Sequence, residues 1–375
     1  MDLNAVTQSL SHVKDGDFLP DHPNRALMLD ADGAVYHMAH PHLPLDRNFI
    51  ELTKYIDYLR RCAGARWVFT FTTMALKGGR EQMAYYQTYQ KKRHDHRTPE
   101  LAQRVTELRQ ALHNYQTETV FPKPNWFFEA DEAIGAFHLY WVNYFQDGES
   151  SVIATGDKDL DMYPGIVMSI ADRKFTHQGV FTPNENGLAG AWYDTYGSVR
   201  YYKKNPKAQG KLVGRGTAFF WGQMLCGDTA DTIAGLPKMQ GYLLDRYKPL
   251  KRKPSGSRPE SPCGASLAAK VISHCRSENS AYRAVSEAYK AYFGKDWKFF
   301  FFENAFLLWM RKTDNVLDVM TYLQPLGFEY ELHPQPLSSI FLCLKHTLEQ
   351  LCLHELAYVH WASTNLFDEV GRVSA

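Results

Sequence analysis

The chain has 375 residues, of which 45% are hydrophobic, so it can bury a sizeable core, and its length suggests two or three domains. Its formal net charge is only +1, so any nucleic acid binding must be local. No apolar run could cross a bilayer, and the N-terminus lacks the layout of a secretory signal. The six cysteines are scattered without a CxxC spacing, which favours reduced thiols in a cytoplasmic protein over a zinc site.

The first part of the chain predicts strands and helices in alternation. Residues 1–24 are a polar lead-in, and the short apolar strand 25–29 ends in Asp30-Ala31-Asp32-Gly33. Apolar residues recur at helical spacing over residues 48–62, and residues 67–71 predict a second strand. Pro99 begins another helix, and residues 119–121 form a third strand. This alternation favours an α/β fold with a mostly parallel sheet.

Between the second strand and Pro99 lies a segment without a core pattern. It carries many basic and aromatic side chains: Lys77, Arg80, Tyr85, Tyr86, Tyr89, Lys91, Lys92, Arg93, His94, His96 and Arg97. Cations suit a polyanionic substrate, and aromatic rings suit stacking on bases. The segment therefore predicts a local contact with nucleic acid.

The next helix opens on Glu129, Asp131 and Glu132. Acids in a first helical turn are ordinary, because they complement the helix dipole. However, Glu129 and Asp131 precede the apolar part of the helix, where both could face one ligand. Both interpretations stay open at this point.

Residues 151–155 predict a buried strand, which leads through a glycine into Asp157, Asp159 and Asp161. These carboxylates repel one another, and Lys158 is the only local charge that offsets them. One interpretation is a solvated turn. The other is a set of oxygen ligands for Mg²⁺ or Mn²⁺ at the carboxyl end of a parallel strand, where open α/β sheets place their sites.

The second half is more helical. Residues 178–216 are loop-like, with a basic stretch of Arg200, Lys203, Lys204, Lys207, Lys211 and Arg215. Asp228 and Asp231 then stand three apart and would share one face of a helical turn. Residues 246–258 are a basic, Pro/Ser-rich loop, and helices are expected at 263–270, 282–293, 300–311 and 316–323. The tail breaks at prolines from 325 on and then forms an amphipathic helix around 342–353.

Four separate places thus carry carboxylates, which together would repel by several kcal/mol without cations. The chemistry that needs many oxygen ligands and no His or Cys is two-metal phosphoryl transfer. We therefore expect a site for two Mg²⁺ ions, with Mn²⁺ as the alternative ion.

These features follow one another in the order seen in 5′-nucleases: Asp30, the basic segment from Tyr89 to Arg93, Phe128-Glu129-Ala130-Asp131-Glu132, Thr155-Gly156-Asp157-Lys158-Asp159-Leu160 and Gly227-Asp228-Thr229-Ala230-Asp231. From about residue 26 to residue 323 the chain resembles that family of flap endonucleases, 5′-nuclease domains of bacterial DNA polymerase I and bacteriophage 5′→3′ exonucleases, the phage branch most of all. The resemblance implies a Mg²⁺-dependent 5′→3′ exonuclease and flap endonuclease of DNA replication. Its partner would be duplex DNA with 5′ ends or flaps, with an RNA/DNA hybrid as a second candidate, in the cytoplasm (the host's, if a phage encodes it).

The resemblance also implies an organisation. Residues 25–216 would be the α/β nuclease domain, with a helical arch at about 77–97 over the site. Residues 217–323 would be a helical DNA-binding region, whose helix–three-turn–helix is split by a basic surface insertion at 241–262. Residues 324–375 would be an extension of unknown role.

Roles for single residues follow from the same resemblance. The metal ligands would be Asp30, Glu129, Asp131, Glu132, Asp157, Asp159, Asp228 and Asp231. Lys91 and Arg93 would be catalytic. The DNA contacts would be Arg80, Tyr89, Lys92, Gly235, Gly264, Lys251, Arg252 and Lys253.

The chain departs from the family pattern in four places, one of which is the split helix–three-turn–helix. Thr72 and Thr73 stand where an Asp usually follows the second strand, Lys91 is offset from the usual arch lysine, and Thr232 replaces an Asn. Two alternatives remain. A haloacid-dehalogenase-type phosphatase would use the Asp30-Ala31-Asp32-Gly33 motif with Asp157 and Asp161, and a nuclease-derived protein could bind DNA without cleaving it.

Overall fold

A computed structural model describes residues 18–74, 77–91, 98–125, 128–170, 175–177, 196–250, 259–313 and 317–330. Its central sheet has the strand order β3-β2-β1-β4-β5-β6. The strands are β1 (His22–Asp30), β2 (Ala65–Thr73), β3 (Val120–Asn125), β4 (Ser151–Thr155), β5 (Ile166–Ser169) and β6 (Phe175–His177). Strands β1 to β5 are parallel, and β6 runs antiparallel to β5. The predicted α/β fold with a mostly parallel sheet is confirmed.

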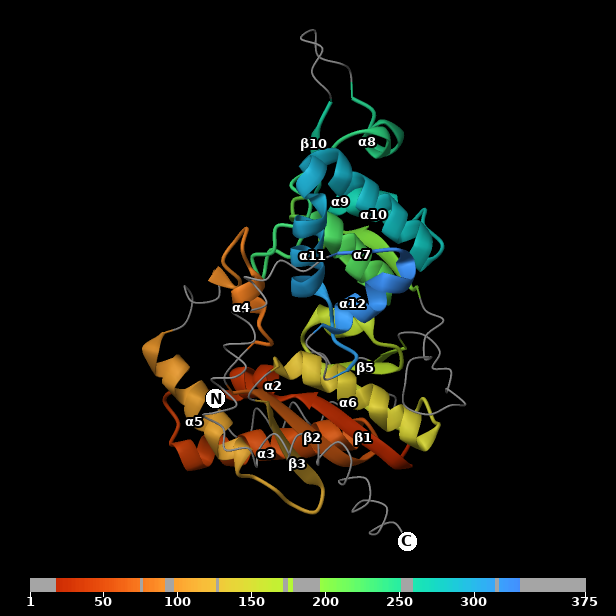
Figure 1. Cartoon of the computed structure of the whole chain (residues 1–375). Helices are drawn as coiled ribbons and strands as arrows, with labels where there is room; N and C mark the ends of the chain where they lie inside the picture. The colour runs from red at the N-terminus through yellow and green to blue at the C-terminus, as the bar shows by residue number, and fades with distance from the viewer. Residues whose placement is uncertain are drawn as a thin grey trace.

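Alternate residues of the central strand supply the two faces of this sheet. Leu27 and Leu29 of β1 belong to the core beneath α2 (Ala31–Met38), α3 (Leu45–Cys62) and α5 (Pro99–His113). Ala26 and Met28 belong to the opposite core, which α6 (Ala130–Phe145) covers. The sheet is therefore the middle layer of the red-to-yellow half of the molecule in Figure 1.

The helical half packs on the α6 side, and its core is continuous with that face of the sheet (Figure 1). Its helices are α7 (Thr217–Cys226), α8 (Tyr242–Tyr247), α9 (Ala265–Ile272), α10 (Glu278–Phe293), α11 (Trp297–Leu308) and α12 (Asp318–Leu323), with 3₁₀ turns at Gly294–Asp296 and Gln324–Leu326. Helix α7 is apolar on all sides, with Phe219, Phe220 and Trp221 fully buried, so it is the central helix of this half. Among the described helices, none combines the length and apolar character that a membrane crossing requires.

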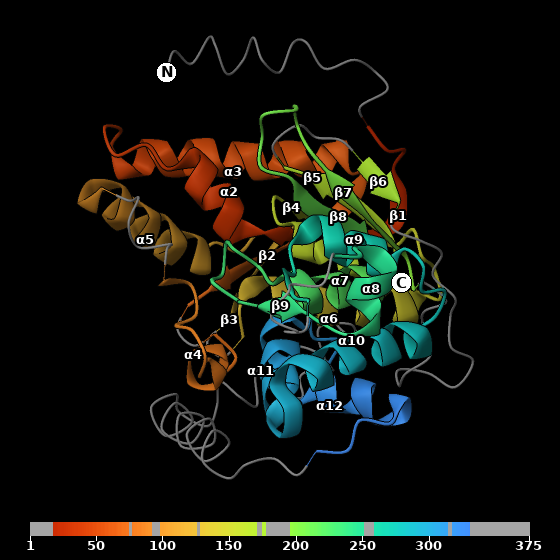
Figure 2. The same cartoon turned by 90° about the horizontal axis from the view of Figure 1, so that it is seen from above.

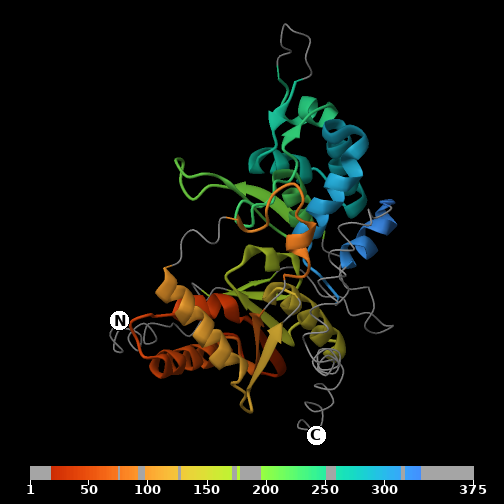
Figure 3. The same ribbon diagram turned by 60° about the vertical axis from the view of Figure 1, so that its left-hand side comes forward.

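Two short antiparallel pairs extend from the helical half. Strands β7 (Ser198–Tyr202) and β8 (Lys211–Arg215) form a hairpin that projects from the body in Figure 3. Strands β9 (Lys238–Met239) and β10 (Ser261–Pro262) pair at the base of the predicted insertion, and β10 and α8 lie in the upper part of Figure 1. The expectation of a surface loop is wrong for part of this insertion, because Leu243 and Leu244 of α8 are buried in the helical core.

The structure describes the segment of the expected arch, at about 77–97, only as far as residue 91, so the arch stays a prediction. The described part of the segment contains one short helix, α4 (Arg80–Met83), and it lies beside α11 in Figures 1 and 2. The rings of Tyr85 and Tyr86 contact Phe299 and Phe300 of α11 edge-on. Predicted features at residues 1–17, Lys92, Arg93, Lys251, Arg252, Lys253 and 331–375 lie outside the described residues.

Candidate metal centre

Three carboxylates from two distant segments come together above the sheet. Asp159, Asp228 and Asp231 each offer one oxygen, and these oxygens lie within 4.8 Å of one another. Asp159 lies on the 3₁₀ helix η2 (Lys158–Met162), which follows β4 after one short turn. Asp228 and Asp231 lie in the turn after α7. The fold thus brings together two acidic motifs that are about 70 residues apart in the chain.

The turn that carries Asp228 and Asp231 is not the helical turn that their spacing suggested. The backbone of Asp228 exchanges two hydrogen bonds with Ile233, at 2.9 and 2.8 Å, and closes a tight loop. Gly227 and Gly235 hold its base with φ of +71° and +62°. A Cβ at Gly235 would lie 2.2 Å from the nitrogen of Gly227, so the base of the loop requires a glycine there.

One cation, Lys158, and one neutral donor, Gln223, contact these carboxylates in the structure. The ammonium of Lys158 lies 2.9 Å from Oδ1 of Asp159 and 2.6 Å from Oδ2 of Asp228. The amide nitrogen of Gln223 donates to the same oxygen of Asp159 at 2.8 Å. Burial, followed by the charge of Asp157, raises the pKa of Asp159 to about 7. Ionised carboxylates are therefore costly here without a counter-charge.

A second group of acids lies at the ends of β1 and β4. Asp30 accepts hydrogen bonds from the hydroxyl of Thr155 at 3.0 Å and from the nitrogen of Gly33 at 3.2 Å. Burial, then the charge of Asp32, raises the pKa of Asp30 to about 6. Asp157 raises the pKa of Asp30, Asp131 and Asp159. Because its charge acts on all three carboxylates, Asp157 connects Asp30 and Asp131 electrostatically with Asp159, which belongs to the cluster beside α7.

The acids at the start of α6 have different surroundings from one another. Glu129 accepts from Arg80 at 2.6 Å, from the hydroxyl of Tyr89 at 2.7 Å and from the amide of Gln90 at 2.9 Å. Glu132 pairs with Arg80 at 3.1 Å and with Arg311 at 3.3 Å. Oδ1 of Asp131 accepts from the backbone nitrogen of Glu132 at 2.8 Å, and burial and then the charge of Glu129 raise its pKa well above the ordinary value. Arginine pairs directly with the two glutamates, whereas Asp131 responds to the charges of Glu129, Arg80 and Glu132, and after them to that of Asp157.

Some of the residues predicted to contact DNA are buried, and others are exposed. Arg80 is 3% exposed and Tyr89 is 5% exposed, so both lie inside the protein rather than on a surface that DNA could reach. Arg80 is buried rather than exposed because the glutamates buried at the start of α6 require a buried cation. Lys91 is exposed. Gly264 caps the start of α9, and the space where its side chain would lie is open.

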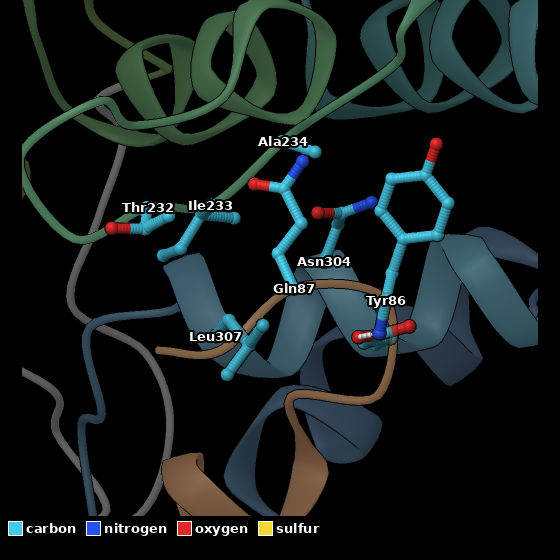
Figure 4. Close-up of a pocket in the computed structure, with 8 residues that line it drawn as sticks. Tyr86, Gln87, Thr232, Ile233, Ala234, Asn304 and Leu307 are labelled. Carbon is cyan, nitrogen blue, oxygen red and sulfur yellow. Dashed lines mark hydrogen bonds between the residues drawn. The ribbon is translucent and has the colours of Figure 1, made fainter. Parts of the chain in front are cut away.

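The basic segment is also attached to α11. The backbone nitrogens of Tyr85 and Tyr86 both donate to Oε1 of Glu303, at 2.6 and 2.7 Å. Figure 4 shows the small pocket between this segment, α11 and the loop, with Tyr86, Thr232 and Asn304 in its wall. None of the carboxylates predicted to bind metal lines this pocket, so the pocket is not the candidate metal site.

The residues at the end of β2 have structural partners. The hydroxyl of Thr73 accepts from the nitrogen of Ala130 at 2.9 Å and so caps α6. The nitrogen of Thr73 donates to Oδ2 of Asp32 at 3.1 Å, and Arg109 lies 2.8 Å from the other oxygen of Asp32. A carboxylate therefore does lie at this strand end, supplied by α2. This carboxylate, Asp32, is part of the Asp30-Ala31-Asp32-Gly33 motif noted in the sequence.

An oxygen-only donor set fits a hard divalent cation such as Mg²⁺ better than zinc, which favours nitrogen and sulfur ligands. One atom supports this fit directly: Oε1 of Gln223 is buried beside the carboxylates and has no hydrogen-bond partner within the described part of the chain. Sequence reasoning missed Gln223, because it lies in an apolar helix without any motif. Fold and site together define an α/β protein with an acidic site suited to divalent cations.

No protein-family model and no curated protein matches the chain. Among solved structures it is similar to the bacteriophage T5 flap endonuclease in a pseudo-enzyme–product complex with DNA and metal ions, at 13% identity and a TM-score of 0.41, over 76% of this chain and 99% of that one. It is similar to the T5 D15 protein co-crystallised with metal ions (15%, 0.41, 75% and 99%) and to the T5 5′-exonuclease with bound zinc (16%, 0.41, 76% and 99%). At these values the likeness assigns no site or activity to this chain.

Proposed function

We propose that this protein is a metal-dependent nuclease that hydrolyses phosphodiester bonds near the 5′ ends of duplex DNA, as a 5′→3′ exonuclease and flap endonuclease. The observation that carries this proposal is the approach of Asp159, Asp228 and Asp231 within 4.8 Å from two separate segments. Such an arrangement costs free energy without cations and serves phosphoryl transfer with them.

The acids have distinct tasks in this proposal. Asp159, Asp228 and Asp231 would hold one ion, and Asp30, Asp131 and Asp157 would hold a second ion at the sheet edge. Mg²⁺ is the expected metal, and Mn²⁺ is the alternative. When bound, the two ions would activate water and stabilise the leaving oxygen. Glu129 and Glu132, proposed from the sequence as ligands, would instead orient the start of α6 through Arg80 and Arg311.

The chain also supplies positive charge for the substrate. Lys91 is exposed at the end of the basic segment, and with Arg93 and Lys92 it would contact the phosphates near the cleaved bond. The open start of α9 at Gly264 would receive a duplex phosphate, because backbone N–H groups at a helix start bind anions. Lys251, Arg252 and Lys253 would extend this contact, and an RNA/DNA hybrid is a second substrate to test.

The test uses 5′-labelled duplex, flap and RNA/DNA substrates with the full chain, in Mg²⁺ and in chelator. We expect cleavage near the 5′ end in Mg²⁺ and none in chelator. DNA binding without cleavage in either condition would favour the non-catalytic alternative. Hydrolysis of a small phosphoester with no action on DNA would favour the phosphatase alternative.

A further inference from the structure

Two donors in the acidic site bind the same two oxygens. Oδ1 of Asp159 receives the ammonium of Lys158 at 2.9 Å and the amide of Gln223 at 2.8 Å. Oδ2 of Asp228 receives the same two groups, at 2.6 and 3.4 Å. These carboxylates belong to the cluster whose oxygens converge within 4.8 Å. Both donors thus bind two of the three carboxylates that would hold a cation in this cluster.

The two donors differ in their freedom to move. The side chain of Lys158 is 37% exposed, so it can turn into solvent without breaking the core. Gln223 is 2% exposed and extends from the central helix α7, so only its terminal amide can rotate. Its Oε1 is buried and lacks a hydrogen-bond partner among the described residues. A buried carbonyl oxygen left without a partner is costly, and a cation would satisfy it.

We propose that Lys158 is the resident counter-ion of this site, which a divalent cation replaces, and that Gln223 then turns its Oε1 inward as an additional oxygen ligand. The inference rests on the metal centre of the proposed function. The charges agree with such an exchange: against the three ionised carboxylates of the cluster, one ammonium leaves two negative charges uncompensated, whereas a divalent ion leaves one. An amide oxygen is an ordinary ligand for Mg²⁺ and Mn²⁺.

Isothermal titration of the full chain with Mn²⁺, without DNA, tests this exchange. Gln223→Met keeps the side-chain length and removes the oxygen, so we expect Mn²⁺ affinity to fall by about tenfold. Lys158→Met removes the competing cation, so we expect affinity to rise several-fold. Asn143→Leu is the matched control, because Asn143 is also buried with an unpartnered Oδ1, but near the end of α6. Its Mn²⁺ affinity should equal that of the wild type.

A purely structural role for both residues gives a different result. Gln223→Met would then lower the melting temperature and leave Mn²⁺ affinity unchanged, which would overturn the inference. Unchanged or weaker affinity in Lys158→Met would overturn it as well. Should Gln223→Met not fold, Gln223→Glu keeps an oxygen and adds charge, so tighter binding is expected and weaker binding contradicts the inference. Wild-type cleavage of DNA together with unaltered affinities in the variants would leave the proposed function standing and remove this inference alone.

Discussion

The backbone nitrogen of Gln90 donates to the carbonyl oxygen of Asp231 at 2.7 Å. This bond joins the last described turn of the basic segment to the acidic loop. The amide of Gln90 also binds Glu129, so one residue contacts two of the acidic motifs. Its φ of +54° lies in the left-handed region, a costly conformation for a residue with a side chain. The contact therefore couples the segment that would meet the DNA to the site that would bind the metal.

Gln90→Val should weaken this coupling. A β-branched residue tolerates positive φ poorly, and the bond to Glu129 is lost, so we expect a loss of about 2–3 kcal/mol in the free energy of unfolding. Mn²⁺ affinity should fall with it. Gln146→Val is the control, since Gln146 also has positive φ (+51°) but ends α6 away from the acids. Comparable metal binding in both variants would separate Gln90 from the site.

The buried partners of Arg80 make a prediction about stability. Arg80→Met would leave Glu129 and Glu132 without this cation, which should cost about 3–5 kcal/mol. Adding Glu129→Gln should recover part of that loss, because one uncompensated charge disappears. Urea unfolding measures both. If Arg80→Met were as stable as the wild type but bound DNA more weakly, Arg80 would contact DNA instead of stabilising the buried glutamates.

His138 gives the protein a pH dependence. Burial lowers the pKa of His138 to about 4 from the ordinary 6.5, and its ring contacts the hydroxyl of Ser151 and the carbonyl of Pro164. The neutral ring is favoured in the folded state, so its contribution is complete above pH 6.5 and decreases as the pH falls toward 4. The loss should reach about 3 kcal/mol. Urea unfolding between pH 7.5 and 4.5 should show this decrease in the free energy of unfolding. In His138→Gln the decrease should be smaller by about 3 kcal/mol.

The sequence predicted four of the six strands of the sheet, because each of those four carries its own local signal, whereas β5 and β6 were not predicted. The runs at 25–29, 67–71 and 151–155 are apolar and short, and all three became parallel strands with acids or threonines at their ends. The convergence of Asp159 with Asp228 also followed from reading acidic turns together. Helix α2 was missed, because its start coincides with the Asp30–Gly33 motif, which was interpreted as the end of a strand.

Other parts of the site could not be predicted, because they depend on tertiary contacts. Arg80 looked like a surface cation among other cations, but the glutamates of α6 draw it inside. Gln223 belongs to an apolar helix, and only the fold brings its amide to Asp159. Arg311, more than 170 residues from Glu132, reaches it through the helical half. No local pattern reports such pairings.

Lys91, which is exposed, and Arg93 should affect rate and not stability. Lys91→Ala and Arg93→Ala should each lower the single-turnover rate on 5′ ends by about 10- to 150-fold, the loss of one charge-assisted phosphate contact of about 1.5–3 kcal/mol. Melting temperatures should stay close to that of the wild type. Lys54→Ala, an exposed lysine on α3, is the control and should leave the rate unchanged. Equal rates in all three variants would argue against a catalytic role for the segment.

The central claim is that the converging carboxylates bind metal ions that cleave DNA. Its most direct test is single-turnover cleavage of a 5′-labelled flap substrate in Mg²⁺ by the wild type, Asp157→Ala and Asp159→Ala, with DNA binding measured in parallel. We predict that both variants lose cleavage while they bind DNA as tightly as the wild type or more tightly, because each removed carboxylate repels phosphate. Cleavage within a few-fold of the wild-type rate in both variants would contradict the account.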